Sequence, residues 1–285
     1  MYHFPIGVIL ESFCTTRSEA IRKASAIGAK GIQMYATSGE NAPENLNTAA
    51  RRALLDEVKG EGLVFSALCG DLGKGFGNAE LNPQLIEKSK RIVDLAKELE
   101  TDIVTTHIGV VPMDKNHDRY KIMQDACAEL AAYADSVGAH FAVETGPEPS
   151  AVLKEFLDSL HSTGVAVNLD PANLCMVTGD DPVQAVYNLR NYIVHTHAKD
   201  GIRLREGNPE YIYQVVHPIP AEFEGVHFFE EVPLGTGSVK FPAYLKALED
   251  IGYRGFLTIE REVGNQPEKD ICTAVDFLTK TIEEN

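Results

Sequence analysis

Four side chains that can bind a metal ion each close a short apolar run in the second half of the sequence. They are Glu144, Asp170, His197 and Glu260. Two glutamates, an aspartate and an imidazole form a mixed oxygen and nitrogen ligand set that suits Mn²⁺, Mg²⁺, Co²⁺ or Zn²⁺. If the fold brings these side chains together, their types predict a divalent metal centre, and they leave the identity of the ion open.

Electrostatics makes a bound cation the simplest partner for this set. Three carboxylates that converge in a weakly polar environment repel one another, and at least one of them would have to stay protonated. A dication removes that conflict. The alternative is that each residue only caps the helix that follows, and Asp170 before Pro171 is also ordinary turn chemistry. Four successive runs that all end in a ligand type favour the metal site.

Predicted strands and helices alternate eight times along the chain. The strands are expected at 6–10, 31–35, 63–67, 102–107, 140–144, 165–170, 192–197 and 255–260. Helices are expected between them, among them one opened by a capping box at 16–19, one at about 43–59 and a last one at 270–282. This alternation predicts an α/β fold, a (β/α)₈ TIM barrel, with residues 1–285 as one domain.

A doubly wound open sheet is the alternative fold. A dinucleotide-binding sheet should carry G-x-G-x-x-G after its first strand, where this sequence has Leu10-Glu11-Ser12-Phe13. In a barrel, by contrast, the carboxyl ends of all strands meet at one face. The barrel therefore also explains why ligand types stand at the strand ends.

Two segments interrupt the regular pattern. Residues 201–237 show no clear periodicity and are far longer than a usual connection, which favours a functional loop or a lid. The glycine-rich run 69–77 follows the third predicted strand. It could hold a phosphate, but it lacks the spacing of a P-loop, and a plain flexible loop is the alternative.

Composition excludes several classes of partner. The chain has 26 Lys and Arg against 42 Asp and Glu, a formal net charge of -16, which disfavours nucleic acid and anionic membranes. Its five cysteines are scattered and never form a C-x-x-C pair, so they are read as reduced thiols. We expect a soluble cytoplasmic protein without a membrane span, acting on a small molecule, with homo-oligomerisation left open.

Four stretches of the sequence resemble the sugar phosphate isomerase/epimerase family of xylose-isomerase-like TIM barrels. They are 143–145, 169–173, 197–200 and the run from 233–237 through 252–260. The similarity covers essentially the whole chain, and the motifs are specific to the superfamily without identifying a member. The resemblance implies a carbohydrate substrate and a divalent metal held by Glu144, Asp170, His197 and Glu260.

The resemblance also implies catalytic and substrate-binding roles. In its ketose epimerase branch, Glu144 and Glu260 would be an acid/base pair on opposite faces of the substrate, working through a cis-enediolate. Arg203 falls at the spacing after His197 where that branch places a substrate-binding arginine. Lys199 would hold a substrate oxygen or pair with Asp200.

Other candidates come from the same end of the predicted barrel. His107 closes the fourth predicted strand, and it would bind substrate or a second metal, or be a satisfied core histidine. Gln33 is a weaker candidate, and Glu11 is read as a loop carboxylate.

Asn173 marks a departure from the pattern. The epimerase and apurinic endonuclease branches typically carry a histidine three residues after the metal aspartate. The Asn173 amide can bind a substrate hydroxyl but is a poor metal ligand. The chain also lacks the D-x-H pair of a trinuclear zinc endonuclease, which together with its charge disfavours DNA repair.

Three functions follow from the sequence. The first is a metal-dependent isomerase or epimerase of a free or phosphorylated sugar. The second is a dehydratase of a cyclic polyol or keto acid, because the same groups can expel a hydroxyl as water. The third is a non-catalytic sugar-binding barrel.

Overall fold

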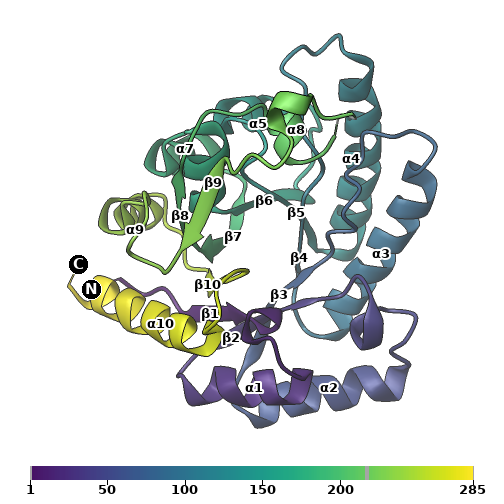
Figure 1. Ribbon diagram of the computed structural model, residues 1–285. Coiled ribbons are helices and arrows are strands. Elements are labelled where there is room, and N and C mark those ends of the chain that lie inside the picture. Colours follow the sequence, from purple (N-terminus) through teal and green to yellow (C-terminus); the bar gives the residue numbers. More distant parts are fainter. Residues whose placement is uncertain (1, 216–217, 285) are drawn as a thin grey trace.

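Eight parallel strands form a closed barrel in the computed structural model, which describes residues 2–215 and 218–284 (Figure 1). The strands follow the order β1-β10-β7-β6-β5-β4-β3-β2. The barrel closes where β1 pairs in parallel with β10, with Ile6 opposite Leu257. The predicted TIM barrel is confirmed. The barrel strands are β1 Ile6–Ile9, β2 Gly31–Tyr35, β3 Val64–Cys69, β4 Ile103–Thr106, β5 His140–Glu144, β6 Val165–Leu169, β7 Ile193–Ala198 and β10 Leu257–Ile259.

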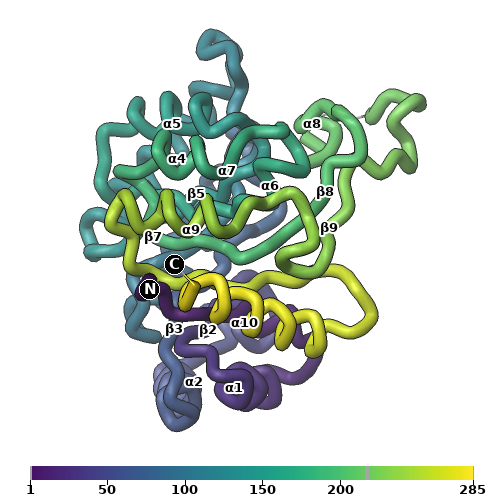
Figure 2. Tube along the Cα trace, turned by 90° about the vertical axis from the view of Figure 1, so that its left-hand side faces the viewer, coloured from purple at the N-terminus to yellow at the C-terminus, as the bar shows by residue number. Residues whose placement is uncertain are grey.

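Helices surround the barrel and cover the outer faces of its strands (Figures 1 and 2). Because both faces of a strand are then buried, its sequence reads as a continuous apolar run, and all five residues of β6 are buried. The helices are α1 Arg17–Ala26, α2 Thr48–Gly60, α3 Asn82–Glu98, α4 Asp118–Val137, α5 Ser150–Asp158, α6 Pro171–Asn173, α7 Pro182–Leu189, α8 Pro209–Ile212, α9 Phe241–Asp250 and α10 Pro267–Glu283. Shorter helical turns are η1 Leu10–Phe13, η2 Gly39–Asn41, η4 Ala221–Phe223 and the π-helical turn η3 Leu174–Thr178.

The capping of α1 and α2 differs from the sequence prediction. Helix α2 begins at Thr48 rather than near residue 43, because the Asn47 side chain caps it by accepting from the Ala50 N–H at 2.9 Å. The predicted capping box at α1 does not form. Thr16 makes no capping hydrogen bond, and Glu19 accepts instead from the Thr15 hydroxyl at 2.6 Å.

The segment 201–237 contains a β-hairpin that periodicity did not predict. Strands β8 Asp200–Arg203 and β9 Phe229–Val232 pair antiparallel outside the barrel ladder, and the loop between them carries α8 and η4. Figure 2 shows this excursion projecting beyond one end of the barrel. At its base, the Asp200 carboxylate accepts from four backbone N–H groups, those of Gly201, Gly235, Gly237 and Val239, at 2.9 to 3.1 Å. One buried aspartate thus ties both ends of the excursion together.

Across the described residues, no helix combines the length and apolar character that crossing a membrane requires.

Candidate metal centre

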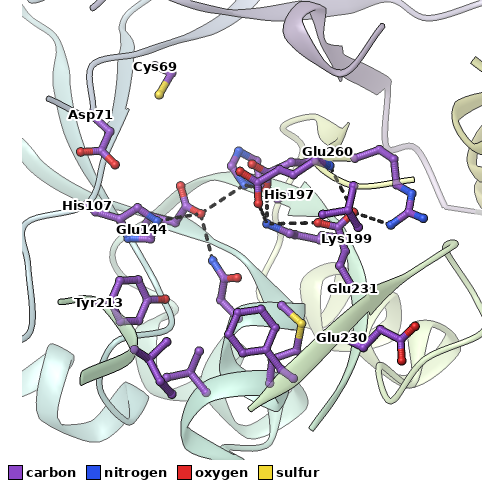
Figure 3. Close-up of a pocket in the computed structure, with 18 of the residues that line it drawn as sticks. Cys69, Asp71, His107, Glu144, His197, Lys199, Tyr213, Glu230, Glu231 and Glu260 are labelled. Carbon is purple, nitrogen blue, oxygen red and sulfur yellow. Dashed lines mark hydrogen bonds and ion pairs between the residues drawn. The ribbon is translucent and has the colours of Figure 1, made fainter. Parts of the chain in front are cut away.

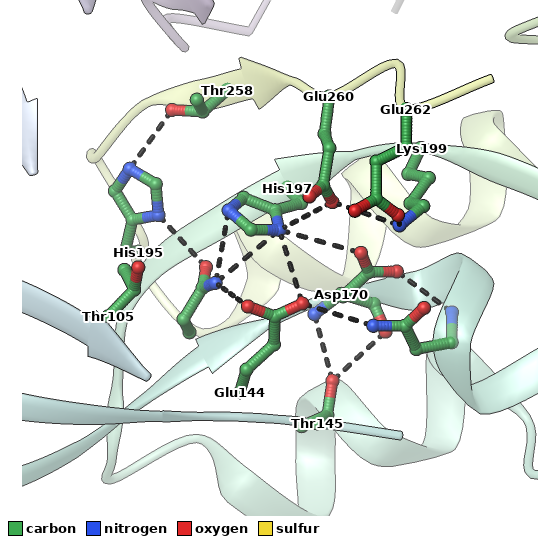
Figure 4. Close-up of polar contacts among 12 residues, drawn as sticks. Thr105, Glu144, Thr145, Asp170, His195, His197, Lys199, Thr258, Glu260 and Glu262 are labelled. Atoms are coloured by element: carbon green, nitrogen blue, oxygen red, sulfur yellow. Dashed lines mark hydrogen bonds and ion pairs between the residues drawn. The ribbon is translucent and has the colours of Figure 1, made fainter. Parts of the chain in front are cut away.

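Four neighbouring barrel strands deliver the four predicted ligands to one point. Glu144 is the last residue of β5, His197 lies next to the end of β7, and Asp170 and Glu260 directly follow β6 and β10. Since β10, β7, β6 and β5 are consecutive in the barrel, their carboxyl ends are adjacent. One ligand atom from each residue lies within 4.8 Å of the other three, and all four residues are buried (Figure 4).

The His197 Nδ1 atom lies at the centre of this group. It is 3.0 Å from Glu260 Oε2, 3.5 Å from Asp170 Oδ2 and 3.6 Å from Glu144 Oε1. Asp170 Oδ2 and Glu260 Oε2 are buried without a partner of hydrogen-bonding geometry. Buried carboxylate oxygens normally have hydrogen-bond partners, whereas these two have only ion-pair neighbours, His197 for both and Lys199 for Glu260. The donor set and these oxygens fit a divalent cation.

The electrostatics of the group also calls for positive charge. Burial lowers the pKa of His197, but Glu260 and Glu144 outweigh it and raise this pKa well above its usual value. Burial raises the pKa of Glu260, but Lys199 and His197 bring it down to about 2. For Asp170, burial prevails and the pKa is raised. Burial favours the neutral forms of Glu144 and Glu260, and the cationic side chains beside them keep both ionised.

Second partners fix the orientation of the ligands. Asn168 donates to Glu144 Oε2 at 3.3 Å, and its Oδ1 lies 2.9 Å from His195 Nδ1. His195 is held in turn by the Thr258 hydroxyl at 3.0 Å. Such partners set the tautomer and rotamer of metal ligands. Asn168 is not among the residues expected from the sequence, although it stands two residues before Asp170, and alternate residues of a strand share a face.

Gln33 and Thr145 complete this support. The Gln33 Oε1 atom lies 3.2 Å from His197 Nε2, so the weaker sequence candidate touches a ligand. The Thr145 hydroxyl donates to the Asp170 carbonyl at 2.9 Å and accepts from its N–H at 2.8 Å. The backbone at the end of β6 is thereby fastened to the end of β5.

A cavity of about 790 Å³ is lined by three of the four ligands, Glu144, His197 and Glu260 (Figure 3). His107 and Asn173 lie on its wall, and both contact the same oxygen of Glu144. The Asn173 amide donates to Glu144 Oε1 at 3.0 Å, and His107 Nε2 lies 3.4 Å from it. Burial lowers the pKa of His107, but Glu144 outweighs this and raises it to about 9. Glu144 thus has its own cationic neighbour, and its pKa is well below the usual value despite burial.

Lys199 is buried in the cavity wall and paired with carboxylates. Its Nζ lies 2.6 Å from Glu262 Oε2 and 3.2 Å from Glu260 Oε2. The predicted alternative of a pair with Asp200 is wrong, because the Asp200 carboxylate is taken up by backbone N–H groups. The partner Glu262 follows β10, and the parallel pairing of β10 with β7 brings it to the end of β7.

Arg203 lies outside the cavity wall. Its guanidinium packs on the backbone of Gly179, where an added Cβ would be 2.4 Å from Nη1. Arg203 is not among the residues that line the described cavity, and its substrate-binding role stays a prediction. The wall is instead completed by the excursion after β8. Tyr213 lies there with its ring centroid 5.6 Å from that of His107 (Figure 3).

Comparisons with known proteins agree with this architecture. The model of the xylose isomerase-like TIM barrel family matches residues 21–281. A crystal structure of a xylose isomerase domain protein from Planctomyces limnophilus aligns at a TM-score of 0.80 with 25% identity, over 99% of this chain and 98% of that one. The probable 3-DHS dehydratase AsbF of Bacillus anthracis aligns at 0.74 with 18% identity, over 97% and 99%. A D-tagatose 3-epimerase-like protein aligns at 0.75 with 16% identity, over 99% and 98%.

The two structures below 25% identity support the fold alone, whereas the family model spans most of the chain. The resemblance found in the sequence motifs is thereby confirmed, and the chain belongs to the xylose isomerase-like TIM barrel family.

Proposed function

We propose that this protein is a divalent-metal-dependent isomerase or epimerase of a sugar, with Glu144 and Glu260 as its acid/base pair. The observation that carries the proposal is the convergence of Glu144, Asp170, His197 and Glu260 beside a cavity that three of them, Glu144, His197 and Glu260, line. A cation held by these four residues would polarise the carbonyl and hydroxyl oxygens of the substrate and so acidify the neighbouring C–H.

The two glutamates have the properties that proton transfer requires. The pKa of each lies below its usual value, so both are carboxylates that can take a proton at neutral pH. They come from β5 and β10, which flank β6 and β7 in the barrel, so they approach a substrate from different sides. One carboxylate removes the proton next to the carbonyl, and the other glutamate, which must carry a proton at that stage, delivers it to the opposite face of the same carbon.

Neighbouring groups keep this pair in place. Asn173 and Asn168 hold the two oxygens of Glu144, while Lys199 lies beside Glu260. Tyr213 and other residues of the excursion cover part of the cavity and reduce the access of water. His107 contacts Glu144 from the wall, where it can also meet a substrate oxygen.

The test is exchange of substrate hydrogen with solvent deuterium. Protein loaded with Mn²⁺, Co²⁺ or Mg²⁺ is incubated with a panel of ketoses in deuterium oxide and followed by NMR. We expect exchange at the carbon next to the carbonyl, and a loss of roughly 10²- to 10⁴-fold in Glu260→Gln, as for removal of a general acid or base. Glu230→Gln is the matched control, because Glu230 lines the cavity but is not one of the four ligands.

Metal content must be measured in each variant, because Glu260 is proposed both to bind the metal and to transfer the proton. Loss of the metal alone would also lower the exchange rate. A metal-loaded wild type that exchanges no proton with any ketose would refute the proposal. Products lighter by one water would replace it with the dehydratase alternative.

A further inference from the structure

The charges that line the cavity are strongly unbalanced. Six of its lining side chains are carboxylates, namely Asp71, Glu144, Glu230, Glu231, Glu260 and Glu262. Lys199 and Arg261 are its lining lysine and arginine within the described residues. Beside a bound divalent cation, and with His107 counted as a cation, the six carboxylates would still outnumber the positive charges by one. An anionic substrate would therefore enter a region of negative potential.

Both lining cations already have carboxylate partners. Lys199 is buried between Glu262 and Glu260, at 2.6 and 3.2 Å. The Arg261 guanidinium bridges Glu231 at 2.6 Å and Asp270 at 2.9 Å. If a phosphate or carboxylate of a substrate recruited either cation, a buried carboxylate would lose its cationic neighbour, Glu260 in the case of Lys199 and Glu231 in the case of Arg261, which is costly.

The glycine-rich loop after β3 turns a carboxylate toward the cavity. Its Gly73 N–H is already bound by the Asp71 carboxylate at 2.8 Å, and Asp71 itself lines the cavity (Figure 3). A loop that holds phosphate points free backbone N–H groups at its ligand, whereas this loop presents an acid. Among the lining imidazoles, His107 and His197 contact the ligand carboxylates, and His227 lies exposed at the rim.

The opposite wall is apolar. Met176 and Val177 of η3, Ile212 at the end of α8, and Phe229 of β9 line it together with Tyr213. A cavity with carboxylates on its floor and hydrocarbon on one wall suits a ligand that presents hydroxyls on one side and C–H groups on the other.

From these observations we infer that the substrate is an electrically neutral, unphosphorylated sugar, and that Glu262 and Glu231 enforce this by occupying Lys199 and Arg261. The inference deepens the proposed function and rests on it. It separates the free sugar from two anionic classes that the sequence left open, the phosphorylated sugar and the keto acid.

The experiment offers each probe in matched forms to the Mn²⁺-loaded protein. D-fructose, D-tagatose and D-ribulose are compared with their terminal phosphate esters, and 5-keto-D-gluconate serves as the carboxylate probe. Binding is measured by calorimetry, and turnover by deuterium exchange. We expect neutral sugars to exceed the anionic forms by at least about 100-fold in affinity or kcat/KM, since a charge facing like charges loses several kcal/mol.

A pair of variants separates the ion pairs from overall charge. Glu262→Gln removes the shortest ion pair of Lys199, and we expect the discrimination against phosphate to fall by roughly tenfold, because the ammonium can then donate a charge-assisted hydrogen bond to the phosphate. Glu230→Gln removes the same charge from the lining but touches neither cation, and it should change the discrimination less. Equal effects of the two variants would contradict the role assigned to Glu262.

The outcomes distinguish this inference from the proposed function. Faster exchange with a phosphate ester than with its free sugar would overturn the inference and leave the function standing. Neutral sugars that bind without exchange would support the inference and overturn the function. Failure of every neutral sugar to bind, while an anionic probe or none binds, would overturn the inference as well.

Discussion

Glu148 is a buried carboxyl whose protonation should control stability at neutral pH. It lies between β5 and α5, and 3% of its surface is exposed. Its Oε2 accepts from the Val111 N–H at 3.1 Å, while Oε1 is buried without a partner. Burial raises the pKa of Glu148 from 4.5 to about 8. The replacement Glu148→Gln keeps the shape of the neutral side chain and cannot ionise.

The sign and size of the effect follow from this pKa. A carboxyl whose pKa is higher in the folded state favours folding most below its unfolded pKa of 4.5, and that contribution is lost as the pH rises through about 8. The interval corresponds to about 5 kcal/mol at most, since one pKa unit is about 1.4 kcal/mol. The wild type should therefore lose stability relative to the Gln variant across this window.

Denaturant unfolding from pH 4 to pH 9, with a chelator present in all samples, measures the difference. At pH 4 the two proteins both carry a neutral side chain and should differ by less than about 1 kcal/mol, which is the internal control. Above pH 6 the wild type should become the less stable protein, by an amount that grows with pH. A difference between the two that stays constant from pH 4 to pH 9 would refute the assignment of a neutral, buried Glu148.

Two further substitutions test the structure around the cavity. Gly146→Ala should lower the free energy of unfolding by about 1–3 kcal/mol and weaken metal binding. Gly146 has φ +137°, and an added Cβ would lie 2.5 Å from Cβ of Asn173, which holds Glu144. Denaturant unfolding and Mn²⁺ titration measure the two effects, and unchanged values would contradict this packing. Arg119→Ala removes the ion pair between α4 and Glu210 of α8. Limited proteolysis should then cleave the excursion several-fold faster while the barrel stays intact. An unchanged cleavage rate would show that this pair does not hold the excursion.

The barrel and its ligands could be predicted because they depend on local patterns. Buried strands read as short β-branched runs, and Pro171 ends the ladder after β6, so the position of Asp170 at a strand end follows from sequence alone. Parallel topology then implies one common face for all strand ends. No knowledge of strand register was needed to group the four ligands.

The partners of these ligands depend on information that a local pattern lacks. Lys199 meets Glu262 only because β7 and β10 are neighbours in the closed barrel, an adjacency across more than 60 positions of sequence. The hairpin strands β8 and β9 span four residues each, too few for alternation to stand out from a loop rich in Gly and Pro. The position of Tyr213 depends on the course of the chain between β8 and β9, so the sequence pattern could not predict it.

The β8–β9 hairpin forms a sheet separate from the barrel, so its sequence can change without altering the barrel strands. Its backbone pairing is self-contained, and Asp200 ties its two ends together without entering the barrel ladder. Mutations, insertions or deletions between residues 204 and 228 can therefore reshape the wall that faces the ligand, while the carboxylates on the floor keep their positions. Exchange of this segment, in evolution or by design, would change which ligand the cavity accepts and leave the four-residue cluster in place.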